Sequence, residues 1–274
     1  MIHYVDGKFV DESEAKIPVN DLGVIRGYGI FDFLRTYNKK PFYLKEHLER
    51  LINSANIVGL DISWNLDELK KIVEETLLRN GNPEAYIRIL VTGGKTEDSI
   101  TPAGEPTLAV LIEQPHYFPE GCYTEGIKVI TISAERHFPR SKYLNYTLGV
   151  VAMKKAKEEN ANEVLYLNRN GFILEGITSN FFVFKGDILI TPEENVLIGI
   201  TRNIVLELAK DKFKIEKRNI LLSELEEADE AFITSTTREV MPVVQVDNII
   251  IKDGNPGKNT KKLIELFRKI TENY

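Results

Sequence analysis

Lys142 is the residue in this chain whose type and setting best suit covalent binding of an aldehyde. It stands in the run 139–145, just before a segment with a helical pattern. A lysine that forms a Schiff base must be partly neutral near pH 7, and a nearby cation such as Arg140 or a helix start favours that form. Most lysines are solvated surface groups, so Lys142 alone indicates little.

Glu175 is the second candidate, because it directly follows the strand-like run 172–174 and precedes a glycine. A carboxylate at the end of a buried strand can pair with the ring nitrogen of pyridoxal phosphate. Keeping that nitrogen protonated makes the ring an electron sink. The alternative interpretation is a turn glutamate at the surface.

Several groups suit the binding of a phosphate. The run 199–202 opens a helix, Thr201 suits its N-cap, and free backbone N–H groups at a helix start form an anion site. Thr236 and Thr237 follow a strand and offer further hydroxyl and N–H groups. Each of these features is also found in ordinary capped helices and turns, so none is specific by itself.

The first half of the chain must supply the elements that position such residues. Two short strands flank the turn at Asp6, and the remaining elements expected there are helices over 46–56 and 65–78 and strands over 30–37, 85–92 and 107–113. Arg50 lies on the first of these helices and could hold a phosphate by two parallel N–H bonds. The alternative is an exposed ion pair with Glu46, four residues earlier.

The second half shows a similar mixture of helices and hairpins. We expect helices over 146–159, 201–210 and 261–270, and strands over 127–132, 163–168, 172–174, 180–184, 188–190 and 231–234. The mixture predicts an α+β fold rather than a regular βαβ alternation. The segment 114–121 carries two prolines and a glycine and is the best linker. We therefore expect a small N-terminal domain over 1–113 and a larger one over 122–274.

Composition narrows the classes of function. The hydrophobic fraction is 43%, the charged fraction is 28% and the net charge is −6, which argues against a protein dominated by nucleic-acid phosphate contacts. A single cysteine, Cys122, excludes an internal disulfide, and the scattered histidines give no metal-ligand spacing. Without a signal peptide or a bilayer-spanning run, we expect the protein in the cytoplasm.

The order and spacing of the motifs are far more specific than any one of them. The set comprises D21-L-G, R26-G-Y-G-I-F-D-F-L-R35, E46-H-L-E-R-L51, K142-x-L-N145, E175-G-x-x-S-N180, G199-I-T-R202 and S235-T-T237. Over nearly the whole chain it resembles the class IV pyridoxal-phosphate enzymes. These are the branched-chain aminotransferases, the D-amino-acid transaminases and the aminodeoxychorismate lyases.

The resemblance implies a role for each matching residue. Lys142 would be the Schiff-base lysine that also carries the Cα proton, and Glu175 would pair with the pyridine nitrogen of pyridoxal 5'-phosphate. The phosphate would be held by Arg50, Ile200, Thr201 and Thr236. The fold implied is fold type IV, a two-domain α+β enzyme whose larger C-terminal, cofactor-binding domain contains a barrel-like sheet. Such enzymes work as homodimers in which a loop of the neighbour closes each site.

The residues expected around the substrate do not follow a single family pattern. Phe31, Tyr86 and Arg88 resemble the branched-chain enzymes, in which the tyrosine and arginine contact the α-carboxylate. The run 93–95 replaces the arginine and histidine of typical D-amino-acid enzymes, yet the K-x-L-N spacing, the S-T-T block and the short chain resemble those enzymes and the lyases. Thr237 is the remaining residue assigned to the substrate.

Arg26 is the distinctive addition. It lies in a turn ahead of the strand from Ile30, and two arginines near one cofactor suit a bidentate carboxylate clamp, so we hypothesise that Arg26 and Arg88 bind the α-carboxylate. Alternatively, Arg26 pairs with Asp21 or Asp32 and only shapes the turn. The prediction is a D-amino-acid transaminase with 2-oxoglutarate or another 2-oxo acid as acceptor. An L-branched-chain aminotransferase is the main alternative, and aminodeoxychorismate lyase is a third.

Overall fold

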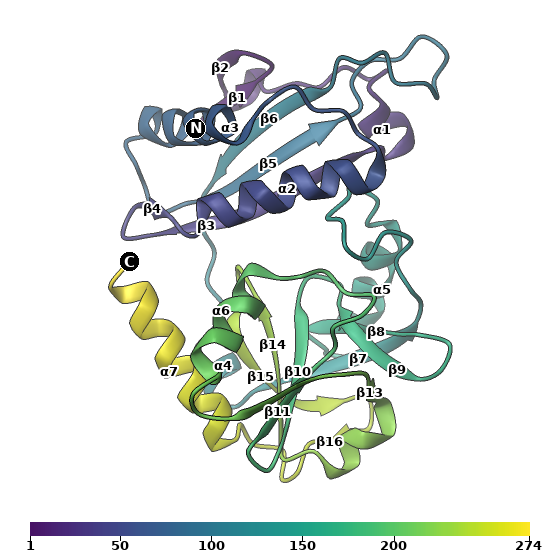
Figure 1. The fold of residues 1–274 in the computed structure, drawn as a ribbon, viewed down its shortest axis with the longest axis vertical. Helices are drawn as coiled ribbons and strands as arrows, with labels where there is room; N and C mark the ends of the chain where they lie inside the picture. The colour runs from purple at the N-terminus through teal and green to yellow at the C-terminus, as the bar shows by residue number, and fades with distance from the viewer. The chain divides into compact units, whose positions relative to one another are not determined.

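The computed structural model describes all residues of the chain, 1–274, and divides it into two compact units. Unit 1 comprises Met1–His116, Arg140–Tyr146 and Tyr274, and unit 2 comprises Tyr117–Pro139 and Thr147–Asn273. Figure 1 shows the order of the elements along the chain. The chain thus passes from unit 1 to unit 2 inside the segment expected as a linker. The segment Arg140–Tyr146, which the sequence-based boundaries assign to the C-terminal domain, packs instead with unit 1.

Unit 1 is a six-stranded sheet covered by helices. The strands follow the order β2-β1-β6-β5-β3-β4. Their bounds are β1 Ile2–Val5, β2 Lys8–Asp11, β3 Gly29–Tyr37, β4 Lys40–Pro41, β5 Tyr86–Thr92 and β6 Thr107–Glu113. The helices are η1 Glu12–Glu14, α1 Leu22–Arg26, α2 Leu44–Val58 and α3 Leu66–Arg79. Apolar residues of α2 and α3 at helical spacing pack on the sheet and bury a single hydrophobic core.

Unit 2 is built on a strongly curved ten-stranded sheet. The strand path is β12-β11-β10-β14-β15-β7-β8-β9-β13, with β16 on β15, and β9 also contacts β10, so the path curls back on itself. The strands are β7 Ile127–Ser133, β8 Glu163–Leu167, β9 Phe172–Gly176, β10 Asn180–Lys185, β11 Ile188–Thr191, β12 Lys214–Lys217, β13 Ile220–Leu221, β14 Glu230–Ser235, β15 Glu239–Val246 and β16 Ile249–Ile250. This half-barrel confirms the predicted mixed fold.

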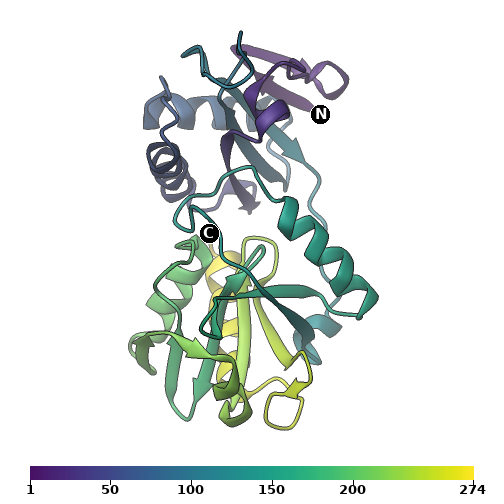
Figure 2. The ribbon, with the colours of Figure 1, turned by 90° about the vertical axis from the view of Figure 1, so that its right-hand side faces the viewer.

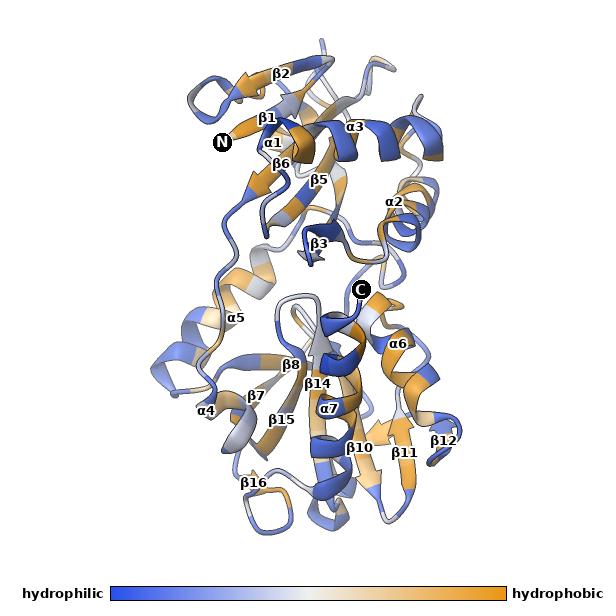
Figure 3. Cartoon of the chain, turned by 90° about the vertical axis from the view of Figure 1, so that its left-hand side faces the viewer, coloured by the Kyte–Doolittle hydropathy of each residue, from blue (hydrophilic) through white to orange (hydrophobic).

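The helices of unit 2 cover different parts of this sheet. They are α4 Gly121–Thr124, α5 Thr147–Glu158, α6 Ile200–Ala209, η2 Leu222–Glu227 and α7 Lys258–Glu272. Helices α6 and α7 contact each other and β14, whereas α5 packs on β7 and β8 (Figure 2). Figure 3 shows α7 as polar along its exposed side and β10 and β11 as almost wholly apolar, as expected for strands buried on both faces. No helix is both long enough and apolar enough to cross a bilayer.

One strand was not predicted and one expectation is wrong. The sequence-based prediction contains no strand over β15, whose Pro242 lacks a backbone N–H and is locally unfavourable in a central strand. Burial of Val240, Met241 and Val243 between β14 and β7 compensates, and a register shift follows between Val243 and Gln245. The wrong expectation concerns the start of α6, whose N-cap is Gly199, so Thr201 lies inside the first turn and does not cap the helix.

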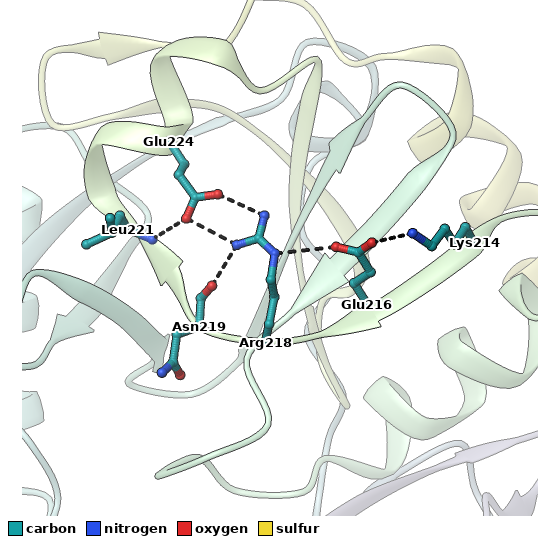
Figure 4. A network of polar contacts seen from close by, with 6 residues as sticks. All are labelled: Lys214, Glu216, Arg218, Asn219, Leu221 and Glu224. Atoms are coloured by element: carbon teal, nitrogen blue, oxygen red, sulfur yellow. Dashed lines mark hydrogen bonds and ion pairs between the residues drawn. The ribbon is translucent and has the colours of Figure 1, made fainter.

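A charged network joins the last strands of the sheet to the strand that carries Glu175. Arg218 donates to both carboxylate oxygens of Glu224 (3.1 and 2.8 Å) and contacts Glu216 at 3.4 Å (Figure 4). Glu224 in turn accepts from the backbone N–H of Leu221 in β13 at 2.8 Å. Since β13 pairs with β9, the network supports the edge of β9.

Candidate active site

The segment that carries Lys142 is fixed to unit 1 by its backbone. The N–H of Phe31 donates to the carbonyl of Lys142 (2.8 Å), and the N–H of Leu144 donates to the carbonyl of Gly29 (2.9 Å). The N–H of Lys142 donates to the hydroxyl of Ser54 on α2 at 3.0 Å. These bonds tie the segment to both β3 and α2. The candidate lysine therefore belongs structurally to the small unit, although it is distant in sequence.

The amine of Lys142 lies against an aromatic ring. Its Nζ is 4.5 Å from the ring centroid of Phe31, and Phe31 packs edge-on against Tyr146. The ring therefore shields one side of the amine from water. The arrangement places Phe31, one of the predicted substrate residues, directly beside the candidate aldehyde-binding lysine.

A buried cluster of Asp32, His47 and Arg50 lies between β3 and α2. Arg50 donates to both oxygens of Asp32 (2.9 and 2.8 Å), and Nδ1 of His47 lies 2.6 Å from Asp32. Burial lowers the pKa of His47, and the charges of Arg50 and Lys142 act in the same direction, whereas Asp32 opposes them. Arg50 is thus paired with a buried carboxylate, that of Asp32.

Phe31, Tyr86 and Arg88 lie on the same face of the unit 1 sheet. Phe33 pairs in register with Arg88, and because side chains alternate between faces, Phe31 and Tyr86 also project from this face. Arg88 lies over the ring of Phe33, 4.7 Å from its centroid, and donates to both oxygens of Glu113 at 2.7 and 3.2 Å. The structure therefore brings these three predicted substrate residues together, with the charge of Arg88 already partly compensated.

Arg26 ends the short helix α1 and is exposed. Gly27 follows in the left-handed conformation (φ 65°) that stops the helix and favours glycine. The Arg26 guanidinium donates to the carbonyl of Ile25 at 3.0 Å, and no carboxylate pairs with it. Asp21 instead accepts from Gly23, Thr92 and Thr107, and Asp32 pairs with Arg50. Neither aspartate considered as its partner is one, so Arg26 remains available for an external carboxylate.

In unit 2, Glu175 is a buried carboxylate in β9 with only 4% of its surface exposed. One oxygen accepts from the N–H of Leu197 at 2.9 Å and from the amide of Asn180 at 3.4 Å. The other lies 3.4 Å from the guanidinium of Arg136. A carboxylate fixed in this way is suited to hold a cationic ring nitrogen.

The residues of unit 2 that are predicted to bind the phosphate lie on segments next to Glu175. The amide of Asn180 also donates to the carbonyl of Leu197 at 2.7 Å, which ties β10 to the segment that leads into α6. No side chain caps α6, so the N–H groups at Ile200 and Thr201 suit an anion. Thr236 and Thr237 follow Thr234, which pairs with Asn180 across the β14–β10 ladder.

These donor sets fit pyridoxal 5'-phosphate. Unit 2 supplies the buried carboxylate for the ring nitrogen and an uncapped helix start for the phosphate. At that start there is no room for a side chain, because a Cβ on Gly199 would collide with the side chain of Asn180. In unit 1, taken by itself, Lys142 carries an amine suited to an aldehyde and Arg50 a guanidinium suited to a phosphate.

Three residues of this region were missed from the sequence. Asp32 lies in the motif R26-G-Y-G-I-F-D-F-L-R35, but the sequence suggests for it only an ion pair with Arg26. Asn180 ends the motif of Glu175, and the sequence suggests no role for it. Arg136 lies far from Glu175 in the chain and in no motif, so nothing local could reveal it.

The comparisons with known proteins agree with this geometry. The family model described as Amino-transferase class IV matches residues 29–246. A putative branched-chain-amino-acid aminotransferase of Methanocaldococcus jannaschii is 38% identical over 97% of this chain and 95% of its own length. A D-alanine aminotransferase of Staphylococcus epidermidis is 32% identical over 99% and 98%.

Solved structures give the same result for the fold. The branched-chain aminotransferase of Thermoproteus uzoniensis with norvaline superimposes with a TM-score of 0.91 and 30% identity. The match covers 100% of this chain and 95% of the other. A further branched-chain aminotransferase of this fold has been solved with pyridoxamine 5'-phosphate. The chain therefore belongs to the class IV aminotransferases, fold type IV enzymes that use pyridoxal 5'-phosphate to transfer amino groups between amino acids and oxo acids.

Proposed function

We propose that the chain is a transaminase of D-amino acids with 2-oxoglutarate or another 2-oxo acid as acceptor. The observation that carries this proposal is Arg26, an exposed arginine with no carboxylate partner, in a unit that also presents Arg88. Two arginines supply the bidentate carboxylate recognition that the run Gly93–Lys95 does not offer.

Each proposed site residue has a distinct task. When bound, the cofactor supplies an electron sink for the charge that develops at Cα. Lys142 binds the cofactor aldehyde, removes the proton from Cα and returns a proton to the cofactor carbon. Glu175 holds the ring nitrogen. Ile200, Thr201, Thr236 and Arg50 hold the phosphate, so that the ring stays in place while Lys142 acts on it.

The clamp must accommodate the ion pair between Arg88 and Glu113. Both side chains are about one-third exposed, at 34% and 35%, so the pair is solvated and can be exchanged for a substrate carboxylate at modest cost. Phe31 and Tyr86 then form the wall beside the substrate, and Thr237 contacts its polar groups. The proposal predicts that Arg26 contributes more to carboxylate affinity than Arg88, because Arg26 has no competing carboxylate.

A specific observation favours the second candidate, an L-branched-chain-amino-acid aminotransferase. Phe31, Tyr86 and Arg88 share one sheet face, their residue types resemble those of the branched-chain enzymes, and several relatives carry that name. Stereochemistry depends on which side of the ring the carboxylate occupies relative to Lys142. A lyase is the third candidate and needs no amino acceptor.

The decisive experiment is a half-reaction screen of D- and L-amino acids, following loss of the enzyme-bound cofactor's absorption band. Bleaching by D-amino acids supports the proposal, and bleaching by L-valine or L-leucine alone overturns it. Arg26→Ala should raise KM for the amino acid at least tenfold, whereas the exposed control Arg169→Ala should leave KM unchanged. Product release without any oxo acid would instead indicate the lyase.

We further propose that the active enzyme is a homodimer and that Arg26 acts in the site of the neighbouring subunit. The surface around Arg26 exposes Val19 and Val24, at 83% and 58%, which suits a segment that a second copy covers. Mixing inactive Lys142→Ala with Arg26→Ala subunits tests this directly. Activity regained on mixing indicates an arginine supplied in trans, and no recovery in a demonstrated mixed dimer indicates that Arg26 serves its own subunit.

A further inference from the structure

We propose that Arg136 is a positioning residue that keeps Glu175 ionised. The proton shared between Glu175 and the ring nitrogen of the cofactor would thereby stay on the nitrogen. Nη1 of Arg136 lies 3.4 Å from Glu175, and the two side chains are only 9% and 5% exposed. Both belong to unit 2. This role concerns the cofactor alone, so it is independent of whether the substrate is a D- or an L-amino acid.

Burial makes such a charge necessary. A buried carboxylate without a cationic neighbour is protonated readily, whereas an opposite charge within about 4–6 Å favours its ionised form. The N–H of Leu197 and the amide of Asn180 also donate to Glu175, but these groups are neutral dipoles. Arg136, by contrast, brings a full positive charge to this carboxylate.

Arg136 is itself fixed by the backbone. Its Nη2 donates to the carbonyls of Phe138 and Pro139 at 3.0 and 2.9 Å. A guanidinium held on several sides cannot swing away from Glu175, so its charge stays directed at the carboxylate. These bonds also order the chain immediately before the segment Arg140–Tyr146, which contains Lys142.

The distance of each group from Arg136 decides whether the shared proton lies on Glu175 or on the ring nitrogen. Arg136 contacts the carboxylate of Glu175 directly, so its charge would lower the proton affinity of the carboxylate more than that of a ring nitrogen held by this carboxylate. Loss of Arg136 would therefore favour protonation of Glu175 and weaken the electron sink that the cofactor supplies when bound.

The test is the nitrogen-15 chemical shift of the ring nitrogen in holoenzyme reconstituted with labelled pyridoxal phosphate. Wild-type and Arg136→Lys protein should show a protonated nitrogen at pH 7.5, and Arg136→Gln should shift toward the neutral pyridine value. The matched control is Arg79→Gln, an exposed arginine of unit 1 that also pairs with a glutamate, Glu75, and this variant should match wild type. An Arg136→Gln spectrum identical to wild type would overturn the proposal.

Two further measurements separate this role from a merely structural one. In a Glu175→Gln background, Arg136→Gln should cause no additional shift, since the arginine acts through the carboxylate; an equal additional shift contradicts the mechanism. If Arg136→Gln does not fold, carbon-13 titration of Glu175 in unaltered protein still decides. A carboxyl that titrates between pH 5 and 8 rules the proposal out, and one that stays ionised supports it.

Discussion

Neutralising Asp32 should be the most informative single perturbation of the small unit. Asp32 is completely buried, yet it accepts two bonds from Arg50 and lies 2.6 Å from His47. Burial raises the pKa of Asp32, but the charges and hydrogen bonds of Arg50 and His47 outweigh that effect and hold the pKa well below its usual range. Asp32→Asn removes the buried carboxylate that contacts Arg50, whose side chain is only 11% exposed.

The expected loss in the free energy of unfolding depends on which contacts of Arg50 remain in the Asp32→Asn variant. Breaking a buried ion pair by removing one partner typically costs about 3–5 kcal/mol. An asparagine retains one acceptor oxygen for Arg50, so we expect the lower end, about 3 kcal/mol. The urea midpoint of unit 1 should fall by about 1–3 M, given a denaturant dependence of roughly 1–3 kcal/mol per molar.

The assay can report on unit 1 alone. Trp64 is the single tryptophan of the chain and packs against the core of unit 1, so its fluorescence follows the unfolding of that unit. The control is Asp61→Asn, an exposed aspartate in the same unit, which should change stability by less than about 0.5 kcal/mol. Affinity for pyridoxal phosphate should also fall, because Arg50 loses the group that orients it.

The dependence on pH gives a second check of the same reasoning. A carboxylate with a depressed folded-state pKa stabilises the protein above its unfolded pKa, about 3.9, and that contribution is lost as the pH falls further. The gap between wild type and Asp32→Asn should therefore be constant from pH 8 to about 5 and narrow below about pH 4. A gap no larger than that of the control, or one that vanishes at neutral pH, would refute the assignment.

Three other predictions concern the cofactor and the sheet. Lys142→Ala should abolish transamination while pyridoxal phosphate still binds noncovalently, as measured by equilibrium dialysis; normal turnover would dismiss Lys142 as the reactive lysine. Gly199→Ala should weaken cofactor binding at least tenfold, because the added Cβ displaces Asn180, whereas Gly121→Ala, whose nearest neighbour is 3.6 Å away, should not. Arg218→Ala should lower stability by about 1 kcal/mol or less, and high salt should shrink that difference, which urea titrations at two salt concentrations can measure.

Most elements could be predicted because their signals are local. The helices at α2 and α3 follow from apolar residues at helical spacing, and Asn65 and Glu68 form a capping box that the short-range sequence encodes. The hairpin after Asn170 follows from its turn residues. By contrast, β15 was invisible because Pro242 is unfavourable locally and only burial between two neighbouring strands outweighs it.

The residues of the candidate site also differ in whether local sequence patterns or only the folded structure could identify them. The sequence by itself indicated the cofactor, because the motifs around Lys142, Glu175 and the start of α6 resemble those of the class IV enzymes. Only the tertiary structure decided the partners: Asp32 for Arg50, and Arg136 for Glu175. Ion pairs of this kind join elements far apart in the chain, so they depend on strand register and helix packing, which no local pattern contains.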